Sequence, residues 1–311
     1  MTIWDRFSRR RFVTSGLAFA STLELQRMAH ALGLAGTAEV CKLVPEQEQG
    51  PFYVAGEMLR SNIREDKPGV SLTIHLIVLD SRTCMPLPHA AIDLWHCDAM
   101  GLYSGYTSNN PMGGPGGGGP GGPEGHEGPG GPPPDFARDN SGPPPGSPPD
   151  GFGPPPGGAP KPTDKLTFLR GIQITDRKGA VHFETIVPGF YMGRTNHVHF
   201  KVRLGGHPDD GNGRQTYAAG HTAHIGQMFF PEDLVTGLMK YEPYSRHQIH
   251  RTTQVEDGVY SRQHGNEVIA TVTSDEQSHV RGGLSANLIV AVDPTATPSP
   301  VGAGGFRPKK S

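Results

Sequence analysis

The sequence predicts an all-β protein, with a β-sandwich core of mostly antiparallel strands, long loops and little helix. Short stretches alternate apolar with polar residues, as expected of strands that are buried on one face. Clusters of turn-forming residues separate these stretches, and only one short segment carries helix-forming signals. Many short strands with turns between them are typical of sandwiches and barrels.

The first strand is expected over 70–78, where Val70, Leu72, Ile74, Leu76 and Val78 recur at every second position. Asp80, Ser81 and Arg82 then predict a turn. A second strand is expected over 90–96, with its apolar residues at 92 and 94 on one side.

A hairpin is predicted next, because residues 176–179 (DRKG) form a turn signal between two strand-like stretches, 171–175 and 180–186. Two later stretches, 197–202 and 286–292, also have the composition of strands. A short helix is expected over 231–240.

One segment is compositionally unlike the rest. The chain of 311 residues contains 44 glycines and 31 prolines, and 35 of these lie within positions 111–160. Such a segment cannot bury enough apolar surface to offset its ordering entropy, so we expect 107–161 to be a disordered insertion. The remaining sequence is long enough to bury a core.

The bulk properties exclude several classes of function. A net charge of −2 argues against nucleic acid as a main partner, and no run of 18 apolar residues predicts a membrane span. The absence of a CxxC pair argues against a thiolate zinc site. Of the three cysteines Cys41, Cys84 and Cys97, one pair could form a disulfide after export, and the sequence leaves the choice open.

The N-terminus resembles a twin-arginine export signal. Residues 8–13 read SRRRFV, and a moderately apolar stretch follows. The alternative is a basic amphipathic helix of a cytosolic protein. The expected organisation is a signal segment over 1–38, a β-sandwich domain over 39–293 and a disordered tail over 294–311. Export machinery is then a partner, and the location is periplasmic or extracellular.

A candidate metal site lies in the expected strand 197–202. His197 and His199 project from the same face because alternate residues of a strand do so, with α-carbons about 7 Å apart. Taken alone, this pair is more simply explained as two surface histidines of an edge strand. Two tyrosines favour a metal site instead. Tyr191 lies six residues earlier, beyond a glycine-containing turn, and Tyr103 lies just past the second strand.

Several separated motifs, in order from about 41 to 245, resemble the intradiol ring-cleavage dioxygenases, in particular the secreted single-chain branch related to the protocatechuate 3,4-dioxygenase β chain. The motifs are PEQEQGPFY at 45–53, PLPHA at 86–90, AMGLY at 99–103, FLRGIQ at 168–173, the block from Tyr191 to His199, and GQMFF at 226–230.

The resemblance implies iron(III) held by Tyr103, Tyr191, His197 and His199. The AMGLY pattern favours Tyr103 over the neighbouring Tyr106. The family resemblance also implies that substrate displaces Tyr191. Phenolate is a hard anionic donor suited to iron(III), and a bound cation removes its proton.

The implied activity is cleavage of a catechol-type ring between its two hydroxyl-bearing carbons by O2, which gives a muconate-type dicarboxylic acid. Arg194 matches the family's arginine that stabilises negative charge on the ring. Gln227 matches a glutamine that lines the pocket. Catechol, protocatechuate, hydroxyquinol, chlorinated catechols and lignin-derived phenolics all fit, and no partner subunit is needed.

Two other functions are compatible with the sequence. One is a non-catalytic secreted β-sandwich that acts as a binding module, because a fold does not fix a function. The other is a copper or zinc protein that uses His197 and His199. His221 and His224, close to Gln227 in sequence, are further candidates for shaping the pocket.

Overall fold

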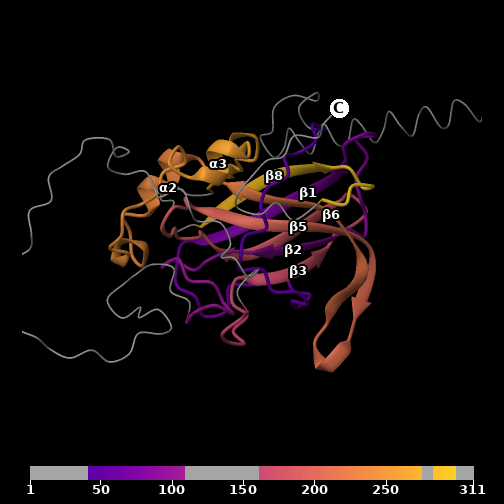
Figure 1. Ribbon diagram of the computed structural model, residues 1–311, viewed down its shortest axis with the longest axis horizontal. Coiled ribbons are helices and arrows are strands. Elements are labelled where there is room, and N and C mark those ends of the chain that lie inside the picture. The colour runs from indigo at the N-terminus through magenta and orange to yellow at the C-terminus, as the bar shows by residue number, and fades with distance from the viewer. Residues whose placement is uncertain (1–40, 109–160, 275–282, 299–311) are drawn as a thin grey trace, which may run out of the picture.

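The computed structural model describes residues 41–108, 161–274 and 283–298, and within these ranges the chain is a sandwich of two four-stranded sheets (Figure 1). The first sheet has the order β4-β1-β8-β7 and the second the order β3-β2-β5-β6. The strands are β1 (Ser71–Asp80), β2 (Ala91–Trp95), β3 (Arg170–Ile174), β4 (Ala180–Ile186), β5 (His197–Asp209), β6 (Thr216–Phe229), β7 (Thr271–Thr273) and β8 (Leu284–Val292). The predicted all-β class is confirmed.

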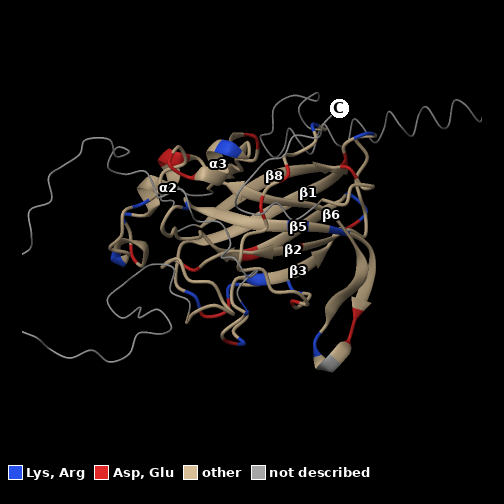
Figure 2. Cartoon of the chain, viewed as in Figure 1, with Lys and Arg blue, Asp and Glu red and all other residues tan. Residues whose placement is uncertain are grey.

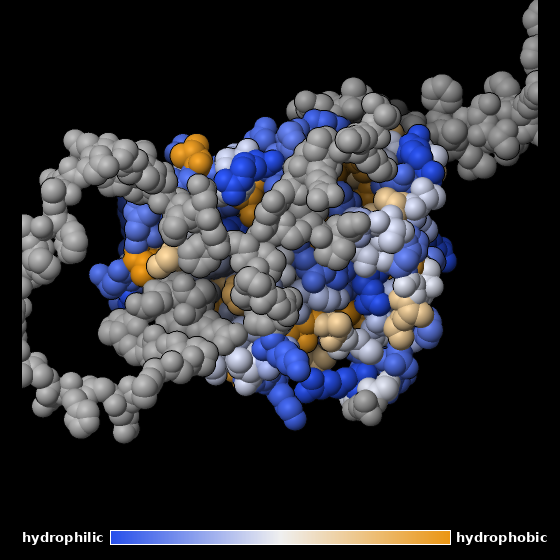
Figure 3. Space-filling view, viewed as in Figure 1, coloured by the Kyte–Doolittle hydropathy of each residue, from blue (hydrophilic) through white to orange (hydrophobic). Residues whose placement is uncertain are grey.

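The main hydrophobic core lies between the two sheets. Ile74 of β1 and Ala286 of β8 belong to the same buried cluster as Ile92 of β2 and Phe200 of β5. Each is fully buried or nearly so, and burying such apolar surface is the dominant favourable term in folding. Charged side chains lie mainly in loops and at strand ends (Figure 2). The surface seen in Figure 3 is correspondingly mostly hydrophilic, with small separate apolar patches.

Most strand pairs are antiparallel, as predicted, with one exception in the first sheet. Strand β1 is antiparallel to β4 but parallel to β8. The period-2 pattern that predicted β1 is seen in its burial, since Leu72, Ile74, Leu76 and Val78 all enter the core between the sheets. Near its end β1 is buried on both faces, where Leu79 packs in a second small cluster.

The predicted hairpin over 171–186 is wrong in its pairing. Both strands and the turn exist, and the Asp176 carboxylate accepts hydrogen bonds from the backbone of Lys178 and Ala180. However, β3 pairs with β2 in one sheet, whereas β4 pairs with β1 in the other. The turn therefore carries the chain from one sheet to the other.

Strands β5 and β6 form the longest pairing among the described strands, of which only the first part of β5 was predicted and β6 was missed. The pairing runs from His197↔Phe229 to Asp209↔Thr216, with a register shift at Val202/Arg203. Beyond the shift the two strands project from the sheet as an arm (Figure 1). The 3-10 turn η1 (Gly211–Gly213) joins them.

Helices are few and short, as expected. The predicted helix is α2 (Glu232–Leu238), and α3 (Gly258–Arg262) and the 3-10 turns η2 (Tyr244–Arg246) and η3 (Gly265–Glu267) add to it. Asp257 begins α3 by accepting hydrogen bonds from the N–H groups of Val259 and Tyr260. In the described part of the chain, no helix has the length and apolar character needed to cross a membrane.

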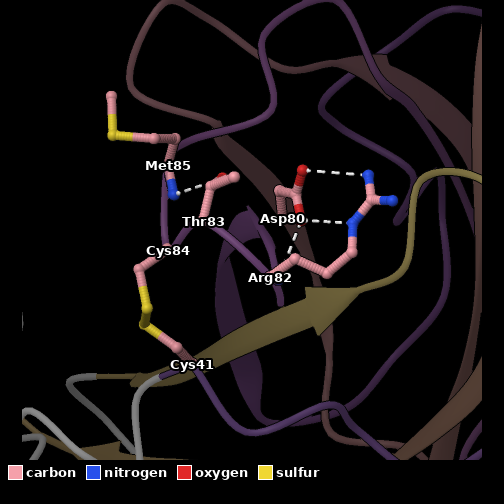
Figure 4. The surroundings of a disulfide bond; sticks show 6 residues. All are labelled: Cys41, Asp80, Arg82, Thr83, Cys84 and Met85. Atoms are coloured by element: carbon pink, nitrogen blue, oxygen red, sulfur yellow. Dashed lines mark hydrogen bonds and ion pairs between the residues drawn. A yellow bond between two sulfur atoms is a disulfide. The ribbon is translucent and has the colours of Figure 1, made fainter.

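A disulfide joins Cys41 to Cys84, in the turn after β1 (Figure 4). In the same turn the Asp80 carboxylate accepts a backbone hydrogen bond from Arg82. The third cysteine, Cys97, is a buried free thiol. The structure therefore selects one of the pairings that the sequence left open.

The two ends of the glycine- and proline-rich insertion are fastened at its base. The Asp164 carboxylate accepts hydrogen bonds from the N–H groups of Gly105, Thr107 and Leu166. The expected disordered segment itself, apart from its first and last residues, lies outside the described residues, as do the expected signal segment 1–38 and most of the tail 294–311.

Candidate active site

The candidate site begins where β5 begins. His197 and His199 project from one face of β5, while Val198 and Phe200 enter the core from the other. Both imidazoles are buried, and their Nε2 atoms lie 3.2 Å apart. The expected common face is therefore seen, but the two rings are enclosed rather than exposed on an edge.

A tight turn places Tyr191 against the same histidine pair. The Arg194 N–H donates to the Tyr191 carbonyl at 2.9 Å, and Gly193 has a φ of +77°, which favours glycine. Thr252 fixes this turn by accepting a hydrogen bond from the Gly193 N–H at 3.0 Å. The Tyr191 hydroxyl then lies 3.4 Å from His197 Nε2.

The second tyrosine comes from the loop after β2. The Asp98 carboxylate shapes this loop by accepting hydrogen bonds from the N–H groups of Met100 and Leu102. The Tyr103 hydroxyl lies 3.3 Å from His197 Nε2. The Tyr106 hydroxyl instead donates to the carbonyl of Tyr53, so the geometry selects Tyr103 of the two.

The protonation of these groups follows from their burial. Burial, reinforced by the positive charge of Arg194, holds the pKa values of His197 and His199 well below the usual range. The His197 Nδ1–H donates to the Thr195 carbonyl at 2.6 Å, so its Nε2 carries a free lone pair. Burial raises the pKa of Tyr103 well above its usual value, and burial, opposed by Arg194, raises that of Tyr191 to about 12.

Four donor atoms thus converge on one point: two neutral imidazole nitrogens and two phenol oxygens. Across the described residues, no group of three or more His, Cys, Asp or Glu is arranged to hold a metal, so a metal here would need the tyrosines. His199 Nδ1 is buried without a hydrogen-bond partner. Two imidazoles and two phenols suit a hard trivalent cation, since such a cation removes the phenol protons that burial otherwise retains.

One row of residues across the second sheet carries the site. His199 lies opposite Trp95 of β2 and Gln227 of β6, and Trp95 lies opposite Arg170 of β3. Residues directly opposite one another share a face of the sheet. The Trp95 ring stacks on His199 at 4.9 Å with an interplanar angle of 6°. All four strands of this sheet therefore contribute to one side of the site.

Arg194 and Gln227 are in direct contact. The Arg194 Nη2–H donates to Gln227 Oε1, and Arg194 Nε lies 3.1 Å from the Asp257 carboxylate. Glu48 lies further away, 3.8 Å from Arg194 Nη1. Burial alone would lower the pKa of Arg194, but the negative charge of Asp257, with smaller contributions from Tyr191 and Glu48, raises it above its usual value. The guanidinium is therefore always charged.

Solved structures of known proteins share this architecture. The chain matches the intradiol ring-cleavage dioxygenase from Tetranychus urticae with 29% identity and a TM-score of 0.58, over 83% of this chain and 98% of that one. It matches a second dioxygenase crystal structure with 27% identity and a TM-score of 0.60, over 84% of this chain and 98% of that one. No protein-family model and no curated protein matches the chain.

The chain has the fold of an intradiol ring-cleavage dioxygenase. The resemblance drawn from the sequence motifs is thereby confirmed, and with it the predicted class of enzyme, an oxidoreductase of the ring-cleavage type.

Three residues of this dioxygenase site were missed by sequence reasoning. Asp257 is fully buried and also accepts a hydrogen bond from the Thr195 N–H. Gln47 accepts one from the Gln227 N–H, and the Glu48 carbonyl accepts one from the Gln227 side chain. A helix-capping pattern marks Asp257 in the sequence, but nothing local predicts its contact with an arginine 63 positions earlier.

The segment that contains Gly50 packs closely over His199. Gly50 has a φ of +70°, and a Cβ at this position would lie 3.2 Å from His199 Cε1. Glycine is therefore favoured twice here, by its backbone conformation and by the close approach. The motif at 45–53, noted only as a family resemblance, forms one wall of the site.

The two further histidines considered for the pocket lie elsewhere. His224 lies opposite Val202, on the core face of the sheet, and stacks on Phe200. His221 is exposed, and its ring contacts the carbonyl of Pro294 at 3.1 Å. Neither is near the four converging donors, because both lie on other parts of β6 than the site-facing Gln227.

Proposed function

We propose that this protein is a non-haem iron(III) intradiol dioxygenase that opens the ring of a catechol between its two hydroxyl-bearing carbons. The observation that carries the proposal is the convergence of the Tyr103 and Tyr191 hydroxyls and the His199 Nε2 within 3.4 Å of His197 Nε2. The similarity to the Tetranychus dioxygenase supports the reaction class.

The proposed ligands are Tyr103, Tyr191, His197 and His199. Bound iron(III) would supply the capacity to draw electron density from a catecholate ring, so that the ring reacts with O2. Copper and zinc fit less well, because the two phenols that line the site are hard oxygen donors. The group that orients His197 is in place, since the His197 Nδ1–H donates to the backbone carbonyl of Thr195.

The protein groups around the ligands have separate tasks. The Tyr191 oxygen would accept one proton from a catechol hydroxyl, which suits a phenol whose pKa is raised to about 12. The Arg194 guanidinium, held by Asp257 and Gln227, lies beside the site and stabilises negative charge that develops on the ring. Both atoms of O2 enter the product as the carbon–carbon bond breaks, so no external reductant is needed.

Aromatic side chains form the surroundings into which a catechol ring would fit. Phe52 stacks on Tyr103 with ring centroids 4.6 Å apart and contacts Tyr191 edge to face. Aromatic side chains provide large apolar contact areas with defined orientations. This composition supports a small aromatic substrate together with O2.

We further propose that the protein is exported by the twin-arginine route. The Cys41–Cys84 disulfide supports an oxidising compartment, because disulfides persist outside the reducing cytosol. The test is cell fractionation of the full chain against a variant with Arg9→Lys and Arg10→Lys. The variant is expected to remain in the cytoplasm, and equal export of both would contradict the proposal.

The function is tested by the visible absorption spectrum of the purified, iron-loaded protein, before and after anaerobic addition of catechol. We expect a charge-transfer band that shifts when catechol binds and returns after O2 is admitted. A colourless protein that retains zinc, or that binds no metal, would contradict the dioxygenase proposal and favour a binding module.

A further inference from the structure

Arg170 ends the row of residues that crosses the second sheet, and it is buried without a full set of partners. Its side chain is 1% exposed. Its Nη1 has no hydrogen-bond partner among the described residues, and the nearest carboxylate oxygen, on Glu57, is 4.0 Å from Nε. Buried arginines are rare and are usually paired, so this one calls for an explanation.

The other donors of Arg170 hold the peptide that follows Tyr103. Its Nε donates to the Ser104 hydroxyl at 2.7 Å, and its Nη2 donates to the Ser104 carbonyl at 2.5 Å. The Ser104 hydroxyl in turn donates to the carbonyl of Phe168 at 2.6 Å. The guanidinium fork thus fixes the backbone on which Tyr103 is carried, and a lysine could not reproduce this geometry.

The charge of Arg170 also lies against two tyrosine rings. Its guanidinium carbon is 5.9 Å from the ring centroid of Tyr103 and 5.9 Å from that of Tyr106. A cation at this distance interacts with the ring electrons, and more strongly where water is excluded. Of these two tyrosines, Tyr103 has its hydroxyl beside His197, whereas the Tyr106 hydroxyl donates to the Tyr53 carbonyl. The charge is therefore placed next to one proposed metal ligand and one tyrosine that is not a ligand.

We propose that Arg170 is a positioning residue for Tyr103, which it holds in place through Ser104 and whose ring electrons it stabilises by its charge. This inference rests on the proposed function, since it concerns Tyr103 as a ligand of iron. It gives Arg170 a task distinct from that of Arg194, which is held on the other side of the site by Asp257.

The proposal is tested on the full-length, iron-loaded protein by two readouts besides turnover: the position of the visible charge-transfer band, and the affinity for iron measured by chelator competition. Arg170→Gln is expected to shift the band to longer wavelength, because the donor electrons lose a stabilising charge. It is expected to weaken iron binding about 10–100-fold, the usual effect of losing a group that orients a ligand. Arg170→Lys is expected to keep the band near its wild-type position but to weaken iron binding.

The matched control is Arg203→Gln. Arg203 lies on the same sheet, with its guanidinium carbon 5.0 Å from the ring centroid of Tyr217, which is not a proposed ligand. Its replacement is expected to leave both readouts unchanged. A folded Arg170→Gln protein with the wild-type band and iron affinity would overturn the proposal.

A second variant decides the matter if Arg170→Gln does not fold. Burial raises the pKa of Glu57 to about 7, so the comparison is made above pH 7, where Glu57→Gln removes the carboxylate charge that partly offsets that of Arg170. The band is then expected to shift to shorter wavelength, and an unchanged band or a shift to longer wavelength would overturn the proposal. A colourless wild-type protein would overturn the proposed function and this inference together, whereas a coloured wild type with unchanged variants overturns this inference alone.

Discussion

Asp257 and Arg194 form a buried ion pair in which Arg194 Nε lies 3.1 Å from Asp257 Oδ2, and the same carboxylate begins helix α3. The arginine proposed to stabilise charge on the ring is therefore oriented by a residue with no contact to the four proposed ligands in the described structure. The Asp257 carboxylate thus links the position of helix α3 to the position of the Arg194 guanidinium.

Asp257→Asn is expected to lower kcat/KM about 100-fold while the visible spectrum of the resting iron protein stays the same. The amide keeps an acceptor for α3 but removes the charge that fixes Arg194, and small misplacements of a catalytic group have costs of this order. Steady-state kinetics with catechol check this. Glu256→Gln is the control, because Glu256 contacts Thr253 and His250 instead. Loss of colour together with activity would show that Asp257 acts only on the fold.

Tyr103→Phe and Tyr106→Phe are expected to differ sharply. The first removes a hydroxyl that lies 3.3 Å from His197 Nε2, so the tyrosinate band should weaken and kcat/KM should fall at least about 100-fold, or about 2.7 kcal/mol. The second removes only the hydrogen bond to the Tyr53 carbonyl, so the band should remain. Absorption spectra and catechol turnover of the pair check this, and similar losses in both variants would contradict the ligand assignment.

The metal-free protein is expected to lose stability as the pH falls from about 7 to about 5. Burial lowers the pKa of His96 to about 4, whereas an unfolded histidine titrates near ~6.5. Protons therefore bind the unfolded chain first, and stability present above the unfolded pKa is lost as the pH falls. His96 alone accounts for about 2 kcal/mol at pH 5. His197 and His199 act in the same direction.

Urea unfolding at a series of pH values measures this loss. His96→Gln should flatten the pH dependence of stability, because it removes the titrating imidazole that hydrogen-bonds to the Cys97 carbonyl and the Thr185 hydroxyl. A stability that does not change over this pH range would show that the histidines are not buried in the neutral form.

Removal of the disulfide by Cys41→Ser with Cys84→Ser is expected to lower the free energy of unfolding by about 4 kcal/mol. The bond closes a loop with a sequence separation of 43, and the cost follows from the entropy that the unfolded chain regains. Chemical unfolding with and without reductant checks this. Reductant should destabilise the wild type and leave the double variant unchanged, and a wild type insensitive to reductant would contradict the pairing.

Deletion of 111–160 is expected to leave the thermal stability nearly unchanged, because Asp164 fastens both ends of this insertion at its base. We expect it to lower activity on bulky catechols relative to small ones, on the hypothesis that the insertion widens the entrance to the site. Melting temperatures and kcat/KM for a small and a bulky catechol check this. Unchanged activity on both substrates would contradict the hypothesis.

Local patterns predicted most of the elements but not their partners. The alternation that marks Leu72 to Val78 depends only on which face is buried, so β1 could be located from the sequence. The assignment of β3 and β4 to different sheets depends on long-range pairing, and the turn at Asp176 is equally compatible with a hairpin. The arm of β5 and β6 was missed beyond Val202, because its exposed residues have no hydrophobic period.

The residues of the candidate site that lie within short sequence motifs could be predicted. His197 and His199 follow from strand periodicity, and Tyr103 and Tyr191 from the family resemblance. Asp257, Arg170 and Gln47 could not be assigned, since each acts through a contact between distant segments of the chain.

The alternation of core-facing and site-facing residues along β5 makes the candidate site sensitive to the register of this strand. A slip of one residue in its pairing would exchange its two faces, placing His197 and His199 in the hydrophobic layer and Val198 and Phe200 at the site. Two polar rings would then be buried without partners, and the ligand set would be lost at the same time. The register that buries Val198 and Phe200 in the core is thus the same one that brings His197 and His199 to the candidate site, so metal bound at the proposed site would also report the correct pairing of β5.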